Sequence, residues 1–309
     1  AISLRPLVND IPTMIKKNLV LGFVARYGCI MSNVWKAANL DHLSPSQLLR
    51  SSAKWIFDYL YCTPADRIAQ GVGWRAHLGN ACHDAMQDVV CEGQDFGSAK
   101  QKAFAYYDDC ISDEDDVMRD RLREAIPGIV ESGTRVLTQA GFAGAKAEQY
   151  ISVELPGIDV PVIGYIDLLQ RTNSGGFRTG EIKTKGPKKT RVLKDGSQGW
   201  GKATLPKKPE WGHVCQGAIY GLATGGEVVV AYAAEHDAIA FDATTCDELK
   251  PSGLAEALED MRQRALMRQN LLRISNDPKV LASITDPDWR HMYQWKIKDE
   301  YLERARDLW

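Results

Sequence analysis

The chain has 309 residues, of which 44% are apolar and 25% are charged, a composition typical of a soluble globular protein with one large domain or two modest ones. It contains no run of about 18 uncharged apolar residues, so we expect no membrane-spanning helix. Its seven cysteines are scattered and never spaced as C-x-x-C, which argues against a disulfide scaffold or a zinc ribbon and favours a reducing, cytoplasmic compartment.

The net charge of −2 conceals an uneven distribution of charge along the chain. Residues 178–208 contain ten lysines and arginines but only two acids, whereas the rest of the chain contains 28 basic and 38 acidic residues. A basic strip on an acidic body is typical of a groove that binds a polyanion such as nucleic acid. The alternative is a solvated loop without a ligand.

Helix signals dominate the first half of the chain. Ser44 is a suitable N-cap and Pro45 suits the first helical position, so we predict a helix from there to about Tyr61. Two further helices are expected over about 79–90 and about 113–140, the latter with a kink or break at Pro127.

The hydrophobic pattern then changes to a period of two, which predicts β-strands. We expect strands over 148–155, 160–171 and 176–183, a basic loop over 184–209, a helix over 211–223, a strand over 228–232, and helices near 249–274 and 289–308. This order predicts a mixed α/β (α+β) fold with a central mixed β-sheet flanked by helices in a single domain, residues 1–309. Within it we expect an N-terminal extension (1–43), a core region (44–232, including the loop 184–209) and a C-terminal helical region (233–309).

A strong turn signal, Thr172-Asn173-Ser174-Gly175-Gly176, joins the second and third expected strands. Because Asp167 and Glu181 are equally distant from Ser174, a hairpin centred there places them directly opposite one another with both side chains on one face. A period of two returns Lys183 to the same face. The sequence therefore predicts two carboxylates and one ammonium together, unless a β-bulge shifts the register.

Two carboxylates directly opposite each other repel, and a divalent cation would offset that repulsion. Oxygen ligands favour Mg²⁺ or Mn²⁺ over Zn²⁺, so we expect one or two ions of this kind. The alternative left open by the residues alone is an exposed ladder of cross-strand salt bridges.

Several motifs together resemble a known family. Gly164-Tyr165-Ile166-Asp167, the turn, and then Glu181-Ile182-Lys183 resemble the G-x-x-D…E-x-K core of the PD-(D/E)XK nucleases. The match is closer to the RecB-like exonuclease branch, whose further motifs resemble Leu43-Ser44-Pro45-Ser46 with Cys62 downstream, Gly79-x-x-x-His83, Glu148 and Gln216-x-x-x-Tyr220. The resemblance covers about residues 44–232 and implies a restriction-endonuclease-like core.

The resemblance implies roles for the central residues. Asp167, Glu181 and the backbone carbonyl of Ile182 would bind the metal. Lys183 would hold or help deprotonate the attacking water and oppose the developing negative charge. Many RecB-like relatives also carry an iron–sulfur cluster on four cysteines. We predict no cluster here, because Cys246 alone lies beyond the catalytic region.

The resemblance also assigns the flanking motifs. His83 would be an additional metal ligand, with His77 as a competing candidate and a histidine packed against the sheet as the ordinary alternative. Gln216 and Tyr220 share a helix face and would bind the scissile phosphate or orient the lysine. Glu148 is expected just outside the ligands, where it binds metal through water or holds a basic neighbour.

Basic residues follow the expected active strand directly. Lys185, Lys188, Lys189 and Arg191 are expected to contact phosphates without reading sequence. Trp200 is expected to stack on a frayed end.

The function that the resemblance implies is a metal-dependent DNA exonuclease or end-processing nuclease of recombination, repair or phage DNA metabolism. Its expected setting is the cytoplasm of a bacterial or phage-infected cell. Its expected partners are a duplex end or a single strand, a recombination or single-strand-binding protein, and further copies of the chain. The alternatives are a structure-specific or single-strand endonuclease, and a non-catalytic DNA-binding subunit that keeps the fold.

Overall fold

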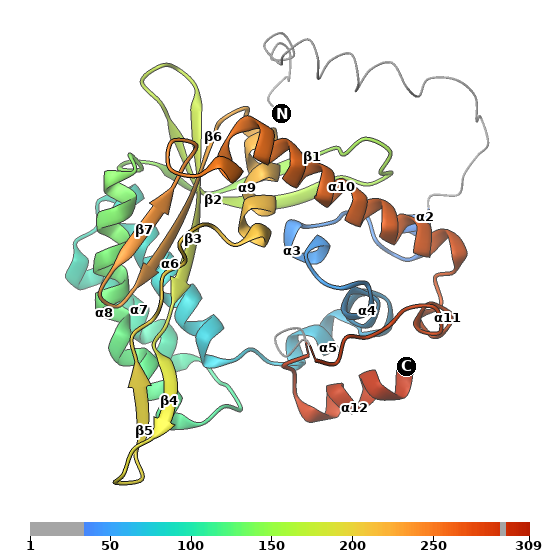
Figure 1. Ribbon diagram of the computed structural model, residues 1–309, viewed down its shortest axis with the longest axis horizontal. Helices are drawn as coiled ribbons and strands as arrows, with labels where there is room; N and C mark the ends of the chain where they lie inside the picture. Colours follow the sequence, from blue (N-terminus) through green and yellow to red (C-terminus); the bar gives the residue numbers. More distant parts are fainter. Residues whose placement is uncertain (1–33, 291–294) are drawn as a thin grey trace.

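The computed structural model describes residues 34–290 and 295–309 (Figure 1). Its α-helices are α2 (Val34–Ala37), α3 (Pro45–Leu48), α4 (Ser52–Ile56), α5 (Pro64–Ala69), α6 (Trp74–Glu92), α7 (Phe96–Asp109), α8 (Asp116–Gln139), α9 (Trp211–Thr224), α10 (Pro251–Ile274), α11 (Pro278–Ala282) and α12 (Asp299–Leu308). A π-helical turn, η1, spans Phe57–Tyr61 and a 3₁₀ turn, η2, spans Asp247–Leu249. The strands are β1 (Lys146–Val153), β2 (Val162–Arg171), β3 (Phe177–Lys185), β4 (Lys188–Val192), β5 (Gln198–Gly201), β6 (Glu227–Ala234) and β7 (Ala238–Phe241).

A five-stranded sheet in the order β1-β2-β3-β6-β7 forms the centre of the protein. Strands β1, β2 and β3 form an antiparallel meander, β3 pairs with β6 in parallel, and β7 returns antiparallel to β6. The parallel pair is joined through α9, as such a pair requires a crossover connection. The prediction of a central mixed sheet flanked by helices is confirmed.

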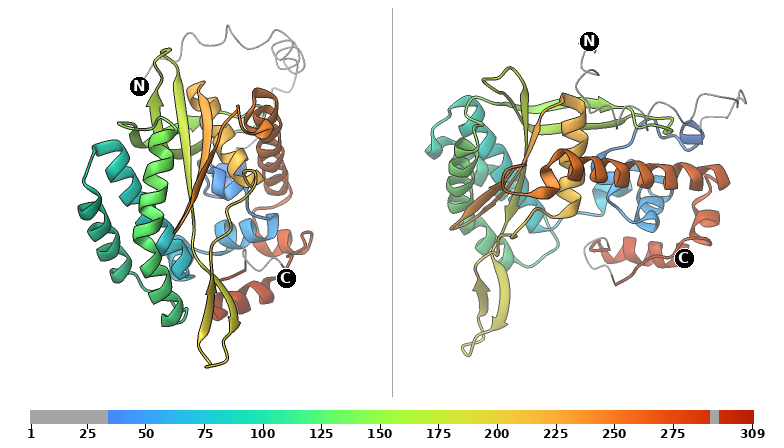
Figure 2. Two further views of the ribbon diagram at one scale, coloured as in Figure 1. Left: turned by 60° about the vertical axis from the view of Figure 1, so that its left-hand side comes forward. Right: turned by 45° about the horizontal axis from the view of Figure 1, so that its top comes forward.

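Helices cover both faces of this sheet (Figure 2). On one face, apolar residues of α6, α7 and α8 pack against Leu168, Ile182 and Val229. On the other face, residues of α3, α4, α9 and α10 pack against the other side of the same strands. The sheet is therefore buried between two apolar layers, which explains the nearly continuous apolar run of β6.

The helix predicted from Ser44 to about Tyr61 is divided into α3, α4 and η1. Ser44 caps α3 as predicted, accepting the N–H of Gln47 at 3.2 Å. A second serine, Ser51, accepts the N–H of Lys54 at 3.2 Å and begins a new helix. The division arises because a serine side chain competes for backbone hydrogen bonds inside a helical run.

The other differences from the prediction are elements that it missed and boundaries that it misplaced. Helices α5, α7 and α11 and strand β7 were not predicted, and α8 runs through Pro127 without a break. The last helix begins at Asp299 rather than near residue 289, and residues 291–294 of the predicted range lie outside the described residues.

The expected N-terminal extension, residues 1–43, is described only from residue 34 onward. This part is integrated into the core, because Trp35 and Leu43 are fully buried and Leu43 pairs with Val162 of β2. Among the described residues, no helix combines the length and apolar character that crossing a membrane requires.

The expected basic loop, 184–209, contains a two-stranded hairpin. Strand β3 continues to Lys185, and β4 and β5 then pair antiparallel with an irregular register. This hairpin, residues 188–201, is called the arm below; it projects from the body in every view (Figures 1 and 2). Arg75 of α6 fixes its base by donating to the carbonyls of Gly186 at 3.4 Å and Pro187 at 2.7 Å.

A buried arginine joins the divided first helix to α10. Arg268 is 1% exposed, and its guanidinium donates to the carbonyls of Gln47 at 3.1 Å, Leu48 at 3.2 Å and Arg50 at 2.7 Å. These are carbonyls that a continuous helix would have satisfied itself. The arginine therefore stabilises the break between α3 and α4.

Replacing Arg268 should destabilise the fold strongly. We expect Arg268→Met to lower the free energy of unfolding by about 3 kcal/mol, because the carbonyls of Leu48 and Arg50 then lose this donor. Urea unfolding would measure the change. The control is Arg273→Met on the same helix, whose exposed guanidinium donates to Asn270 at 2.8 Å and whose removal should cost less than about 0.5 kcal/mol. Equal stability of the two variants would contradict this role.

Candidate active site

The hairpin of β2 and β3 has the register predicted from a turn centred on Ser174. Its pairs run from Arg171↔Phe177 to Leu168↔Gly180. One further step along both strands places Asp167 opposite Glu181.

A third acidic residue belongs to the same row of the sheet. In the pairing of β1 with β2, Glu148 falls between Ala147 and Gln149, whose own pairs flank the position of Asp167. Glu148, Asp167 and Glu181 therefore form one row across three adjacent strands. This arrangement, called the acidic row below, places Glu148 closer to the centre of the site than its expected outer position.

The backbone ladder is interrupted at the acidic row. Asp167 is paired with neither Glu148 nor Glu181. Instead the Oδ2 atom of Asp167 accepts the backbone N–H of Ile182 at 2.7 Å, and its carbonyl accepts the side chain of Gln87 at 2.8 Å. Side chains thus replace the interstrand hydrogen bonds that the row would otherwise make.

The interruption also reverses the side-chain alternation of β2. Ile166 packs with the α9 layer and Leu168 with the α6 layer, although residues two apart in a regular strand share a face. Opposite them, Glu148 has a φ of +48°, a left-handed conformation that is rare for residues other than glycine. Strained backbone of this kind clusters at functional sites.

Helix α6 brings His83 to the acidic row. Its Nε2 atom lies 3.4 Å from Oδ2 of Asp167 and 4.0 Å from Oε1 of Glu148. Burial disfavours the imidazolium, but the carboxylates of Asp167 and Asp84 raise the pKa of His83 to about 10. The competing candidate, His77, is directed elsewhere, since its Nε2 atom lies 3.1 Å from the carbonyl of Ile111.

Glu181 and Lys183 form an ion pair at the other end of the row. Glu181 is 1% exposed, and no described residue donates a normal hydrogen bond to either of its carboxylate oxygens. Burial and the charge of Asp167 raise the pKa of Glu181 to about 8. Burial opposes the charge of Lys183, but the carboxylates of Glu181 and Asp167 outweigh it and raise the lysine's pKa.

Helix α9 approaches the row from the opposite face of the sheet. Gln216 donates through Nε2 to the hydroxyl of Tyr220 at 2.8 Å, so the two predicted residues do share a helix face. Tyr220 is 3% exposed. Burial, together with the charges of Glu181 and Asp167, raises the pKa of Tyr220, so its hydroxyl keeps its proton near the row.

The basic residues that follow β3 fall into two groups. Lys185 pairs with Glu210 at 2.5 Å, and Lys189 pairs with Asp115 at 2.5 Å while lying 6.0 Å from the ring of Trp200. Trp200 also packs against the α6 layer. Lys189 and Trp200 hold the arm to the body, and Lys185 joins the end of β3 to the start of α9.

The second group has no ion-pair partner within the described part of the chain. Lys188 and Arg191 belong to it, and both are exposed along β4. Of the residues expected to contact nucleic acid, these two present unpaired charge.

The structure also brings in residues that the sequence did not single out. Gln87 contacts the acidic row from α6, and its signal was its spacing of four from His83, which places both on one helix face. His213 precedes Gln216 by three residues on α9, and Glu210 precedes that helix as its N-cap.

His213 is held in its neutral form. The hydroxyl of Tyr232 accepts the N–H of Glu210 at 2.9 Å, which leaves its own hydrogen for Nδ1 of His213 at 2.7 Å. Burial and the charge of Lys183 lower the pKa of His213 to about 4. The neutral ring therefore accepts the hydroxyl hydrogen of Tyr232 at Nδ1, which a protonated ring could not do.

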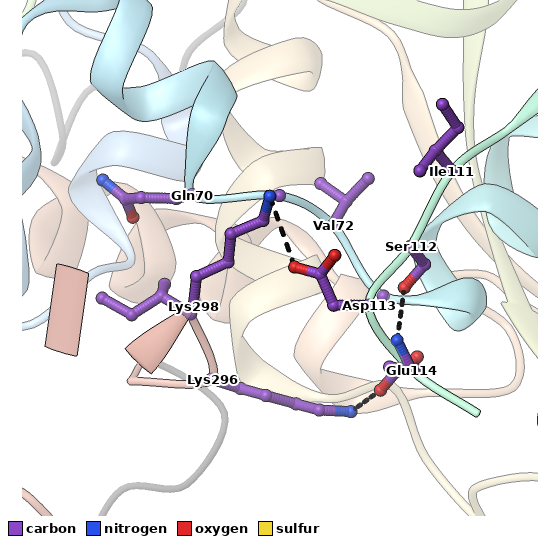
Figure 3. Close-up of a pocket in the computed structure, with 11 residues that line it drawn as sticks. Gln70, Val72, Ile111, Ser112, Asp113, Glu114, Lys296 and Lys298 are labelled. Atoms are coloured by element: carbon purple, nitrogen blue, oxygen red, sulfur yellow. Dashed lines mark hydrogen bonds and ion pairs between the residues drawn. The ribbon is translucent and has the colours of Figure 1, made fainter. Parts of the chain in front are cut away.

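A cavity of about 190 Å³ lies at a different place, at the N-terminal end of α6 (Figure 3). Residues 70–73, 111–114 and 296–298 line it. Its charges are compensated by ion pairs, Lys298 with Asp113 at 3.3 Å and Lys296 with Glu114. Because Glu114 also accepts the N–H of Trp74 at 2.7 Å, the helix end is already satisfied there.

The donor set of the acidic row suits a divalent cation. One ligand atom from each of His83, Glu148 and Asp167 lies within 4.8 Å of the others, a spacing that one ion can bridge. Beside the ammonium of Lys183, no described residue donates to the buried oxygens of Glu181. Several oxygens and one imidazole nitrogen fit Mg²⁺ or, with the nitrogen, Mn²⁺.

Comparison with known proteins agrees with this geometry. The family model of the PD-(D/E)XK nuclease superfamily matches residues 42–287, so the chain belongs to that superfamily of nucleases. No curated protein matches the chain.

Two solved structures resemble the fold distantly. One, named "Putative exonuclease" from Eubacterium rectale, is 16% identical with a TM-score of 0.45, and the alignment covers 81% of this chain and 88% of that one. The other, SSO0001, is 14% identical with a TM-score of 0.29 over 63% of this chain and 75% of that one. At these values neither likeness carries an argument about activity.

The neutral state of His213 predicts how stability depends on pH. Its folded-state pKa of about 4 lies below the ordinary 6.5, so the unfolded chain takes up the proton first as the pH falls. This contribution to stability is present above pH 6.5 and is lost as the pH falls to about 4. His213→Asn should therefore lose less stability than the wild type over that window in urea unfolding. Parallel decline of the two proteins would contradict the assignment.

Proposed function

We propose that the protein is a divalent-metal-dependent DNA exonuclease or end-processing nuclease that hydrolyses phosphodiester bonds. The observation that carries the proposal is the acidic row, together with His83 next to Asp167 and Lys183 paired with Glu181. Clustered carboxylates next to an ammonium are what cleavage of a phosphodiester needs, because a cation and a fixed positive charge both oppose charge developing on phosphate.

In this proposal His83, Glu148 and Asp167 hold the cation, and Glu181 supplies a further oxygen. A bound cation would supply a Lewis acid for the phosphoryl oxygen and for the attacking water. The carbonyl of Ile182 stays a predicted ligand. We expect Mg²⁺ or Mn²⁺, as one or two ions.

Lys183 acts as the fixed positive charge. Its ammonium stays protonated, because the carboxylates raise its pKa, and it can orient the attacking water and donate to the phosphate. Tyr220, whose hydroxyl also keeps its proton, can donate to the same phosphate while Gln216 fixes its direction.

Action at DNA ends rests on the resemblance of the His83 and Gln216/Tyr220 motifs to the RecB-like branch. The proposed settings are recombination, repair or phage DNA metabolism in the cytoplasm. Cooperation with a recombination or single-strand-binding protein, and assembly with further copies of the chain, stay predictions of the sequence.

The arm offers the proposed contact with the DNA backbone. Lys188 and Arg191 are exposed and lack ion-pair partners among the described residues, and the arm begins three residues beyond the end of β3. Contacts of this kind position a substrate without reading its sequence.

The decisive experiment compares linear with closed circular single-stranded DNA, together with end-labelled duplex, in Mg²⁺ and in Mn²⁺. We expect the linear and end-bearing substrates to be degraded and the closed circle to survive. Cleavage of the circle would replace the exonuclease by an endonuclease. Failure to cut any DNA or RNA with either ion would favour a non-catalytic binding subunit.

Lys183→Ala should retain DNA binding but lose at least about 100-fold in cleavage rate, because its charge opposes charge that develops only during reaction. Filter binding and single-turnover cleavage would separate the two effects. The control is Lys250→Ala, whose ammonium pairs with Asp247 at 2.6 Å outside the acidic row. Unchanged cleavage by Lys183→Ala would remove the lysine from the mechanism.

The unpaired cations of the arm should determine the salt dependence of binding. We expect the double variant Lys188→Ala/Arg191→Ala to bind duplex more weakly and to reduce the slope of log affinity against log salt by about 1.8, or about 0.9 for each phosphate that the variant no longer neutralises. Lys189→Ala on the same strand is the matched control, since its ammonium is occupied by Asp115 and the slope should hardly change. Equal effects of the paired and unpaired lysines would count against the arm as the binding surface.

A further inference from the structure

A single amide of α6 contacts His83, Glu148 and Asp167, three of the residues proposed to hold the cation. Gln87 is 7% exposed, and its Nε2 atom donates to the carbonyl of Asp167 at 2.8 Å and to Oε1 of Glu148 at 2.9 Å. The same atom lies 3.4 Å from Nε2 of His83, one turn earlier on the helix.

The two hydrogen bonds of Gln87 occupy the place where the sheet is interrupted. The carbonyl of Asp167 would meet a strand neighbour in a regular ladder, and here the amide of Gln87 is its donor. A buried carbonyl without a donor is destabilising, so the interruption depends on such a replacement.

The amide of Gln87 also contacts Glu148, the strained residue of the acidic row. A left-handed conformation for a residue such as Glu148 is destabilising and persists only where the surroundings over-determine it. The hydrogen bond from Gln87 is the contact that fixes the carboxylate of Glu148 while the backbone holds that conformation.

We propose that Gln87 is a positioning residue, which keeps β1 and β2 apart at the acidic row and holds the carboxylates of Glu148 and Asp167 at ligand distance from His83. The inference rests on the proposed metal-dependent function and deepens it. Residues that fix metal ligands from outside typically contribute about 10- to 100-fold to metal affinity. Gln87 would do so for two ligands at once.

The test is the affinity of the full-length protein for Mn²⁺, measured by calorimetry without DNA. Gln87→Met keeps the length of the side chain and removes the amide, and we expect it to bind Mn²⁺ about 10- to 100-fold more weakly than the wild type. Asn80→Leu is the matched control, because its amide lies on the same helix but donates to Tyr106 at 3.2 Å. Its affinity for Mn²⁺ should be unchanged.

A double-mutant cycle distinguishes positioning from general stability. If Gln87 acts through Glu148, the double variant Gln87→Met/Glu148→Gly should lose less affinity than the product of the two single losses. Glycine accepts the positive φ at this position, so the second change removes the carboxylate without adding strain. Losses that simply multiply would contradict the proposed coupling.

The other outcomes of the Mn²⁺ measurement also decide whether Gln87 positions the metal ligands. A folded Gln87→Met with wild-type affinity for Mn²⁺ overturns the inference and leaves the nuclease proposal intact. A wild-type protein that binds no Mn²⁺ overturns both. Should Gln87→Met fail to fold, Gln87→Asn provides the same measurement, because its amide is one methylene too short to reach both of its acceptors. Loss of folding in both variants would assign Gln87 to stability alone.

Discussion

Three carboxylates in one row of a sheet repel one another, and much of the local structure can be understood as a response to that repulsion. Asp167 uses a carboxylate oxygen to accept the N–H of Ile182, which removes a backbone donor that the interrupted ladder would have left unpaired. Lys183 neutralises Glu181 at one end, and His83 lies against Asp167 near the other. Before a cation binds, these positive groups offset the charge of the acidic row. On binding it, His83 would release its proton, because only a neutral imidazole nitrogen is a metal ligand.

Each compensating side chain comes from an element that is held by close packing. A Cβ at Gly133 of α8 would lie 2.0 Å from the sulfur of Met86, so only glycine allows α8 to press this closely on α6 beside Gln87. On the other face, a Cβ at Gly217 would lie 2.6 Å from Cγ1 of Val228 on β6, directly after Gln216. Two glycines therefore bring the helices of both layers close to the sheet beside the side chains that act at the row.

The sequence predicted the parts of the site that depend on local symmetry. A turn of five residues centred on Ser174 determines the register on both sides, so the positions of Asp167 and Glu181 followed from counting. The strained backbone of Glu148 had no such signal, and the spacing of four between His83 and Gln87 indicates a shared helix face but not the partners of Gln87. Gln87 contacts Glu148 and Asp167, which lie 61 and 80 residues further along the chain. Hydrophobic periodicity contains no information about contacts between residues so far apart in sequence.

The prediction of secondary structure from the sequence was limited in a similar way. The arm was expected to be a loop because every residue of β4 is exposed, so the strand lacks the apolar alternation by which half-buried strands are recognised. The break at Ser51 was missed because its stabilising donor, Arg268, lies more than 200 residues further along the chain. The break at Ser51 thus depends on a distant polar contact, which a local sequence pattern does not contain.

The ion pairs of the structure show how many of the basic residues in 178–208 are already paired with acids. Of the ten basic residues between 178 and 208, five pair with acids: Arg178 with Glu227, Lys183 with Glu181, Lys185 with Glu210, Lys189 with Asp115 and Lys208 with Glu248. The local excess of positive charge therefore overstates what a ligand would meet.

Within the described residues, the basic residues of this segment without an ion pair are Lys188, Arg191, Lys194, Lys202 and Lys207, and the first three lie on the arm. Lys189 fixes the arm to Asp115 at the start of α8, and the arm follows closely on the strand that carries Glu181 and Lys183, while its unpaired cations extend into solvent. A polyanion attracted to those cations would thus be held on a support that is continuous with the acidic row.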